Sequence, residues 1–217
     1  MNAGRGFVIA LLGAESTGKT TLALALRDAL AVEGLEAAVV PEYLREFCDR
    51  ERRTPRPDEQ RAIADEQTRR IEAAARAHDF VIADTSALMI AVYSDQVFGD
   101  TSLYAHAQTA HARACDLTLL TALDLPWQAD GLQRDGPEVR EPVDVKVRAA
   151  LQRAATPYSV VFGTGAARVE SGLACIHRAL APPAEGSDGS NGSVRWHWHC
   201  ERCGDADCER RPLLPRG

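Results

Sequence analysis

The sequence predicts an α/β fold, a three-layer α/β/α sandwich around a mostly parallel five-stranded sheet, followed by a small Cys/His tail. Short apolar runs recur along the chain, and helical segments separate them, which is typical of parallel strands joined by right-handed crossovers. The length of 217 residues, with 45% hydrophobic content, suffices for one sizeable core. We therefore expect one main domain over residues 1–180.

Five apolar runs are the expected strands. The first is continuous and ends at Gly13, which suits a strand buried on both faces of a parallel sheet. The second is closed by Pro41, and the third runs into Asp84. The expected strands cover residues 7–12, 37–40, 80–83, 117–120 and 159–162.

Helical spacing fills the segments between these strands. Residues 21–32 carry leucines one turn apart, and Gly34 stops the pattern. After a break near residues 54–57, we expect Asp58 to cap a long charged helix that lies largely on the surface. Ser86 is the expected cap of the helix after the third strand. Residues 125–142 are rich in Pro, Gly, Asp and Arg and predict a mobile loop.

The charge balance narrows the classes of partner. The formal net charge is −6 and the pI is about 5.5, whereas a surface for nucleic acid or anionic membrane needs clustered excess Lys and Arg. The longest apolar start, residues 7–12, is too short to span a bilayer, and no basic leader precedes it. We expect a cytoplasmic protein that binds neither nucleic acid nor membrane.

Residues 13–20 carry the strongest chemical signal, a G-x-x-x-x-G-K-T string between a buried strand and a helix. Glycines let the backbone curl so that its N–H groups face phosphate oxygens, while Lys19 reaches the β- and γ-phosphates and Thr20 binds Mg²⁺. The alternative is a chance glycine turn before a helix. The string predicts a P-loop NTPase fold that binds ATP through Gly13, Glu15, Ser16, Thr17, Gly18, Lys19, Thr20 and Thr21.

Two carboxylates follow predicted strands, where ligands bind in open α/β sheets. Asp84 is expected near the magnesium ion, although it would also suit a helix entry. Glu42 can accept the proton of an acceptor hydroxyl; the alternative is a helix-start glutamate facing the dipole. Arg45, one turn later, would face the same cleft or solvent.

Several segments together resemble the ribosylnicotinamide kinase domain of NadR-type proteins, over about residues 6–180. They are Gly13-x-Glu15-Ser16-x-Gly18-Lys19-Thr20, Glu42-Tyr43-x-Arg45-Glu46, Ile82-x-Asp84-Thr85, Pro126-Trp127-x-x-Asp130-Gly131-Leu132 and Gly163-Thr164-Gly165-x-x-Arg168. Gln133 stands where the family usually has arginine, and Arg134 comes one place later.

This resemblance implies ATP-dependent phosphorylation of nicotinamide riboside to nicotinamide mononucleotide, a step of NAD biosynthesis. From their positions we expect Lys19, Glu42, Asp84, Arg134 and Arg140 to be the catalytic residues, with the two loop arginines forming a lid over the phosphates; the alternative for each arginine is a merely solvated side chain. The implied substrate contacts are Glu42, Tyr43, Arg45, Trp127 and Asp130, and Gly163 and Arg168 add to the nucleotide site. The alternatives are another nucleoside or nucleotide kinase, an ATP-hydrolysing switch that signals through the tail, and a binding module whose working part is the tail.

The last residues differ in composition from the rest. Residues 181–193 have linker composition, and residues 194–217 hold a cysteine cluster. Cys200, Cys203 and Cys208, with His199 or His197, can bind Zn²⁺ tetrahedrally; the alternatives are a disordered reduced tail, a redox pair, or a docking surface for a partner that the sequence does not name.

The remaining polar and thiol side chains have no spacing that indicates chemistry. We expect Asp116, Asp124 and the histidines between residues 78 and 111 at the surface or at helix ends. Cys48, Cys115 and Cys175 are expected to be reduced and mostly buried.

Overall fold

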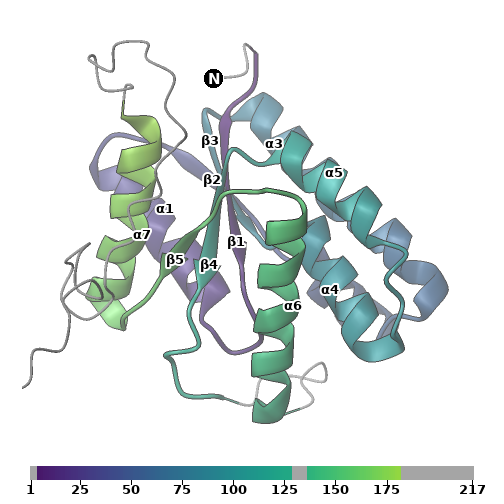
Figure 1. Ribbon diagram of the computed structural model, residues 1–217. Helices are drawn as coiled ribbons and strands as arrows, with labels where there is room; N and C mark the ends of the chain where they lie inside the picture. The colour runs from purple at the N-terminus through teal and green to yellow at the C-terminus, as the bar shows by residue number, and fades with distance from the viewer. Residues whose placement is uncertain (1–3, 129–135, 182–217) are drawn as a thin grey trace, which may run out of the picture. The chain divides into compact units, whose positions relative to one another are not determined.

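A sheet of five parallel strands lies at the centre of the computed structural model, which describes residues 4–128 and 136–181 (Figure 1). The strand order is β2-β3-β1-β4-β5, so β1 lies in the middle, between β3 and β4. The strands are β1 (Phe7–Leu12), β2 (Ala37–Val40), β3 (Phe80–Asp84), β4 (Leu117–Thr121) and β5 (Ser159–Val161). The predicted parallel five-stranded sheet is confirmed.

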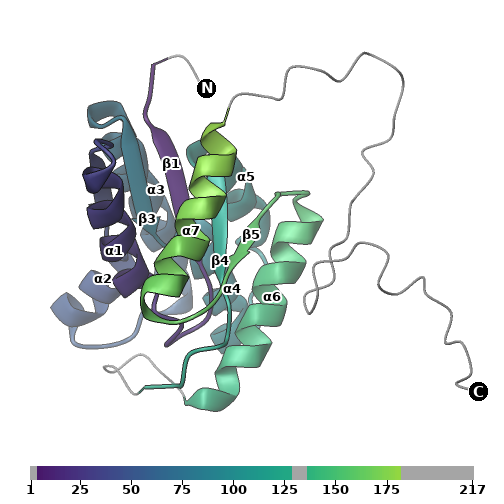
Figure 2. The same cartoon turned by 90° about the vertical axis from the view of Figure 1, so that its left-hand side faces the viewer.

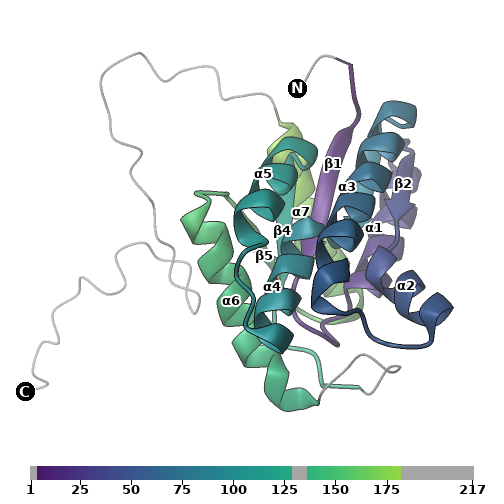
Figure 3. The same ribbon diagram turned by 90° about the vertical axis from the view of Figure 1, so that its right-hand side faces the viewer.

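Helices cover both faces of this sheet. Figure 2 shows α1 and α7 on one face, and Figure 3 shows α3, α4, α5 and α6 on the other. The short α2 packs on α3 beside the edge strand β2. The helices are α1 (Lys19–Val32), α2 (Tyr43–Glu51), α3 (Gln60–Ala77), α4 (Ala87–Phe98), α5 (Tyr104–Ala114), α6 (Arg140–Arg153) and α7 (Gly165–Leu180), with 3₁₀ turns at Pro57–Glu59 and Pro137–Val139.

Alternate residues of each strand supply the two halves of the core. Ile9, Leu11 and Leu119 pack against α1 and α7, whereas Val8 and Leu12 point to the opposite face. Because successive strand side chains point to opposite faces, a sheet covered on both sides needs continuous apolar runs. This requirement explains the unbroken apolar sequence of β1, whose residues 8–12 are fully buried.

Ser86 caps α4 as predicted, since its Oγ accepts a hydrogen bond from the Leu88 N–H at 3.3 Å. The prediction that Asp58 caps the long helix was wrong. Asp58 lies within the preceding 3₁₀ turn, and α3 begins at Gln60 after Glu59, whose carboxylate instead binds Arg53 and the Arg56 N–H. The α3 helix is also less superficial than expected, because one face is buried against the sheet.

The predicted loop over residues 125–142 extended too far. A 3₁₀ turn begins at Pro137 and α6 begins at Arg140. Proline is tolerated in the first turn of a helix, where its missing N–H would have no intrahelical partner, so Pro142 does not prevent the start of α6. The rest of the predicted loop, residues 129–135, lies outside the described residues.

The cysteines of the described residues are free thiols: Cys48 is buried, and Cys115 and Cys175 are partly buried. Burial raises the pKa of Cys48 to about 11 and that of Cys115 to about 12. No helix in the described part of the chain is long and apolar enough to cross a membrane. The predicted linker beyond Ala181 and the predicted tail lie outside the described residues.

Candidate functional site

The loop between β1 and α1 curls through three left-handed or glycine-specific backbone positions. The φ angles are 147° at Gly13, 55° at Ser16 and 74° at Gly18. A Cβ on Gly13 would lie 2.1 Å from Thr121 Oγ1, and one on Gly18 would lie 2.9 Å from Leu125 Cδ1. Backbone conformation favours glycine at both positions that the sequence singled out, and at Gly13 the lack of space requires it as well.

Lys19 and Thr20 begin α1 directly after this loop. The Lys19 ammonium donates to the Gly13 and Ala14 carbonyls, each at 2.8 Å, so it lies over the loop itself. Thr20 Oγ1 donates to Asp84 Oδ2 at 2.5 Å. This bond joins the start of α1 to the carboxyl end of β3.

The Thr20 and Asp84 oxygens fit a hard divalent cation. They converge from two elements, and Asp84 Oδ1 is buried with no hydrogen-bond partner among the described residues. Hydroxyl and carboxylate oxygens are the ligands that Mg²⁺ prefers. Elsewhere in the described ranges, no group of three or more His, Cys, Asp or Glu side chains can hold a metal. The predicted zinc ligands Cys200, Cys203, Cys208 and His199 lie outside those ranges.

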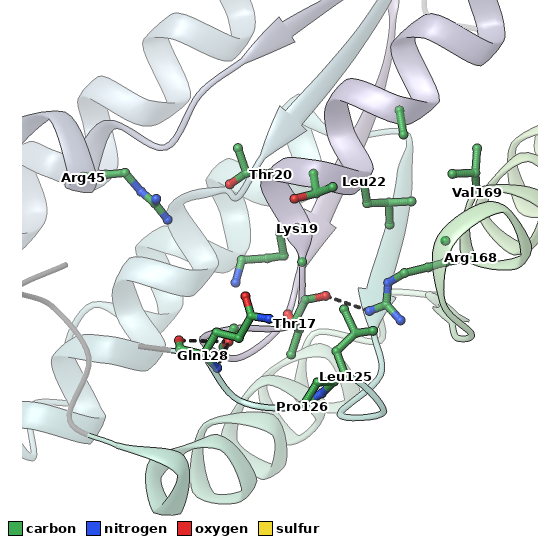
Figure 4. Close-up of a pocket in the computed structure, with 15 residues that line it drawn as sticks. Thr17, Lys19, Thr20, Leu22, Arg45, Leu125, Pro126, Gln128, Arg168 and Val169 are labelled. Atoms are coloured by element: carbon green, nitrogen blue, oxygen red, sulfur yellow. Dashed lines mark hydrogen bonds between the residues drawn. The ribbon is translucent and has the colours of Figure 1, made fainter. Parts of the chain in front are cut away.

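A cleft of about 850 Å³ opens beside the loop (Figure 4). Figure 4 shows Lys19 and Thr20 on one side of this cleft, Arg45 approaching from α2, and Arg168 and Val169 on α7. The lining residues are Ser16, Thr17, Gly18, Lys19, Thr20, Thr21, Leu22, Ala25, Arg45, Leu125, Pro126, Gln128, Gly165, Arg168 and Val169. Its volume suits a small organic ligand.

Glu42 lies at the turn between β2 and α2. Its side chain is 15% exposed, and Glu42 Oε2 lies 3.7 Å from Arg45 Nη2. Arg45, in the first turn of α2, lines the cleft described above. Glu42 and Tyr43 are not among the described residues that line it. The Tyr43 ring packs against the core, with the Arg70 guanidinium 4.4 Å from its centroid.

A buried glutamine holds this turn, and the sequence analysis missed it. Gln67 on α3 is 0% exposed; its Oε1 accepts from the Tyr43 N–H at 2.7 Å, and its Nε2 donates to the Pro41 carbonyl at 3.4 Å. These two groups flank Glu42. The signal was present, because Gln67 lies one turn from both Ile63 and Ile71 on the apolar face of a predicted helix.

The segment after β4 lies over the glycine loop. Ser16 Oγ accepts from the Gln128 N–H at 2.7 Å and lies 3.2 Å from the Gln128 carbonyl oxygen, to which it can donate. Trp127 is partly buried, and its indole N–H has no hydrogen-bond partner among the described residues. Asp130 and Arg134, which the sequence analysis assigned to substrate and to the lid, lie outside the described residues.

Arg140 differs from its prediction. It is 8% exposed, forms the first residue of α6, and donates to the Leu125 carbonyl at 2.9 Å. The expectation of a lid arginine in a mobile loop was wrong about its surroundings. The Arg140 guanidinium is buried and bonds to the Leu125 carbonyl, whereas its Nε and Nη2 have no hydrogen-bond partner among the described residues.

Arg168 and Asp124 meet beside the cleft. Their side chains form an ion pair at 2.7 Å, and Asp124 Oδ2 also accepts from the Gly163 N–H at 2.6 Å. Burial alone would raise the pKa of Asp124, but hydrogen bonds from Arg168 and Gly163 outweigh it and lower that pKa. Asp124 is exposed, as the sequence analysis expected, but its sequence spacing did not indicate the pairing with Arg168. Asp116 pairs instead with Arg5, at the amino end of β4.

His111 lies in the last turn of α5, which agrees with the expected helix-end position, but it is only 2% exposed. Its Nδ1 lies 2.8 Å from Ser86 Oγ and its Nε2 lies 2.9 Å from Thr118 Oγ1. Burial lowers the pKa of His111 to about 4. The neutral imidazole therefore connects β4 to the residue that caps α4, two positions after Asp84.

Comparison with known proteins assigns the fold. Residues 8–168 match the family model described as an AAA domain. No curated protein matched the sequence. Similar solved structures include NadR protein in complex with NR and NadR protein in complex with NAD and AMP-PNP, both 19% identical, with TM-scores of 0.66 and 0.65.

Those alignments cover 84% and 85% of this chain but 53% and 52% of the NadR chains, so the chain spans about half of their length. Thymidylate kinase from Ehrlichia chaffeensis is 14% identical with a TM-score of 0.56, and its alignment covers 81% of this chain and 99% of that one. These likenesses show that the predicted P-loop NTPase sandwich is the fold of this chain.

Proposed function

Because this chain belongs to the AAA domain family, we propose that it is an ATP-dependent small-molecule kinase that phosphorylates nicotinamide riboside at its 5′-hydroxyl. One observation carries the proposal. The glycine loop follows β1, Asp84 ends β3 and Glu42 follows β2, and these strands are neighbours in a parallel sheet. A phosphate site and the Glu42 carboxylate therefore share one sheet edge, as phosphoryl transfer to a hydroxyl requires.

The phosphates of ATP would be held by backbone N–H groups of residues 14–20 and by the Lys19 ammonium. Thr20 and Asp84 would hold the magnesium ion, which when bound neutralises phosphate charge. Lys19 would exchange its two backbone carbonyl partners for phosphate oxygens, which are better acceptors for a cation.

Glu42 would act as the general base. The acceptor hydroxyl oxygen forms a bond to the γ-phosphorus while the bond from that phosphorus to the β,γ-bridging oxygen breaks, and the hydroxyl proton passes to the Glu42 carboxylate. The products are ADP and the phosphorylated acceptor. Such transfer depends mostly on alignment and charge stabilisation, which the held turn at Glu42 and the glycine loop would supply.

Two observations support nicotinamide riboside as the proposed acceptor. One is the motif resemblance that includes Trp127 and Asp130, because an indole face can stack on a cationic pyridinium ring and a carboxylate can bind ribose hydroxyls. The other is the likeness to NadR protein in complex with NR. The likeness to a thymidylate kinase favours a second candidate, a nucleoside monophosphate as acceptor.

Product formation tests the proposal. Purified protein with magnesium-ATP and a panel of nucleosides and nucleoside monophosphates, including nicotinamide riboside, is analysed by mass spectrometry. We expect nicotinamide mononucleotide from the wild type, none from Lys19→Ala, and normal yield from the matched control Lys146→Ala, whose ammonium pairs with Asp95 away from the loop. If only another panel member were phosphorylated, that compound would be the acceptor in place of nicotinamide riboside. ATP binding without any product would refute the kinase assignment.

A further inference from the structure

One buried guanidinium connects three segments that are distant in the chain. Arg168, near the start of α7, is 5% exposed. Its Nη2 donates to the Thr17 carbonyl at 2.8 Å, and its Nη1 donates to Asp124 Oδ1 at 2.7 Å and to the Gly163 carbonyl at 3.0 Å. Figure 4 shows the Arg168 side chain extending from α7 toward Thr17. The glycine loop is thereby tied to the loops that follow β4 and β5.

Thr17 is also held through its side chain. The residue is 0% exposed; its Oγ1 donates to the Ala14 carbonyl at 2.8 Å and accepts from Thr121 Oγ1 at 2.7 Å. Thr121 is the last residue of β4. Thr17 therefore has little freedom to rotate, because β4 fixes its hydroxyl and α7 fixes its carbonyl.

The held carbonyl determines where the next N–H points. The Thr17 C=O and the Gly18 N–H belong to one planar trans peptide, so they point in opposite directions. Thr17, Gly18 and Arg168 all line the cleft, and because the Thr17 oxygen is turned to Arg168, the Gly18 N–H points away from that guanidinium. A glycine at this position would otherwise rotate readily, since its backbone has no Cβ to restrict it.

Asp124 offsets the free-energy cost of burying the Arg168 guanidinium. An isolated buried charge is costly, and a carboxylate partner with further hydrogen bonds offsets that cost. Asp124 supplies one oxygen to Arg168 and the other to the Gly163 N–H. Asp124 is not among the described residues that line the cleft, so any effect on a ligand there is indirect, and Arg168 is the lining residue to which its side chain is bonded.

We infer that Arg168 and Asp124 are positioning residues for nucleotide phosphates, which act by fixing the Thr17–Gly18 peptide so that its N–H faces the cleft. This inference rests on the proposed function in one respect, that the cleft binds the phosphates of ATP. It differs from the expectation that Arg168 contacts the nucleotide itself. A contact with the base or ribose would favour ATP alone, whereas an oriented N–H favours any ligand with the same phosphates.

Calorimetric titration of the full chain distinguishes a base or ribose contact of Arg168 from an oriented Gly18 N–H. It needs no phosphoryl acceptor. The ligands are magnesium-ATP and magnesium-tripolyphosphate, and the variants are Arg168→Gln and Asp124→Asn. The matched controls are Arg5→Gln and Asp116→Asn, an ion pair that also measures 2.7 Å but lies at the amino end of the sheet. Thermal unfolding of each variant is recorded in parallel.

We expect Arg168→Gln to weaken both ligands by the same factor, about tenfold or more, as for the loss of a charge-assisted hydrogen bond. Asp124→Asn should weaken both by a smaller common factor, and Arg168→Lys should restore part of the affinity. The Arg5 and Asp116 controls should bind both ligands as the wild type does, even where their unfolding temperatures fall.

Two results would overturn the inference. Weaker ATP binding with unchanged tripolyphosphate binding would make Arg168 a base or ribose contact. Unchanged binding of both ligands by folded variants would leave the ion pair a purely structural contact. If Arg168→Gln does not fold, Asp124→Asn, at a side chain that is 33% exposed, decides the question alone. A wild type that binds neither ligand would refute the proposed function instead, which is a separate result.

Discussion

The glycine loop and the Glu42 turn lie on one sheet edge, but they are held in different ways. The loop depends on its own backbone, with Gly13 and Gly18 in conformations that other residues avoid, and on Thr121 and Arg168 that hold Thr17. The Glu42 turn is ordinary backbone, and a single remote side chain, Gln67, binds the groups on either side of it. A site formed by special backbone conformations can be recognised from a local sequence motif, whereas a site held by one distant side chain cannot.

The largest effect is expected at Gly13, where the glycine loop depends on its own backbone. We expect Gly13→Ala to weaken ATP binding more than about 100-fold, because its Cβ would lie 2.1 Å from Thr121 Oγ1 in a strained backbone. The matched control is Gly34→Ala, where φ is also positive, at 80°, but nothing lies within 4 Å of the added Cβ. Calorimetric titration with ATP measures both. Equal binding by the two variants would show that the loop tolerates a side chain and that its glycines are not required.

In the Glu42 turn, we expect Glu42→Gln to lower kcat about 100-fold or more, because the general base is lost. The affinity for ATP should stay within about twofold of the wild type. Steady-state kinetics with the acceptor found in the panel and calorimetry with ATP measure the two effects. Glu51→Gln, at the far end of the same helix, is the control and should behave as wild type. If Glu42→Gln retained full kcat, Glu42 would be a helix-start residue and not the base.

Removal of Gln67 sharpens the comparison further. We expect Gln67→Leu to lower the free energy of unfolding by about 1–3 kcal/mol, because the buried Tyr43 N–H and Pro41 carbonyl lose their partner. It should also lower kcat about tenfold with ATP affinity unchanged. Gln60→Leu is a matched control on the same helix, since Gln60 Oε1 is buried without a partner and its removal should be neutral or stabilising. Denaturant unfolding and kinetics of both variants provide the readout.

The smallest effect at neutral pH is expected at His111. The pKa of His111 is lowered from its ordinary value of about 6.5 to about 4 in the folded chain, so the unfolded chain binds the proton more readily. Stability should therefore be complete above about pH 6.5 and should fall by up to about 3 kcal/mol as the pH falls toward 4. Denaturant unfolding across this range measures the slope, which His111→Gln should reduce. An unchanged slope in the variant would assign the acid sensitivity to other groups.

The contrast between local motifs and contacts distant in sequence explains how much of the fold and the site could be predicted from the sequence. The five strands, the order of helices and the glycine loop follow from local patterns, such as the buried run of β1 and the Ser86 cap. Gln67, Asp124 and His111 were missed because each acts through a contact with residues distant in sequence, and one buried polar residue has no spacing to detect. Arg140 was misplaced because prolines at residues 137 and 142 suggest a loop, although a helix tolerates them in its first turn.

The bond from Arg168 to the Thr17 carbonyl spans 151 positions in the sequence. During synthesis the glycine loop leaves the ribosome early, long before α7 exists. Contacts of such large sequence separation form late, because the intervening chain must first be closed into a loop. A nascent chain that stops before α7 would thus carry the complete G-x-x-x-x-G-K-T string with its Thr17–Gly18 peptide free to turn. Competence to bind nucleotide would arise only after α7 has been synthesised.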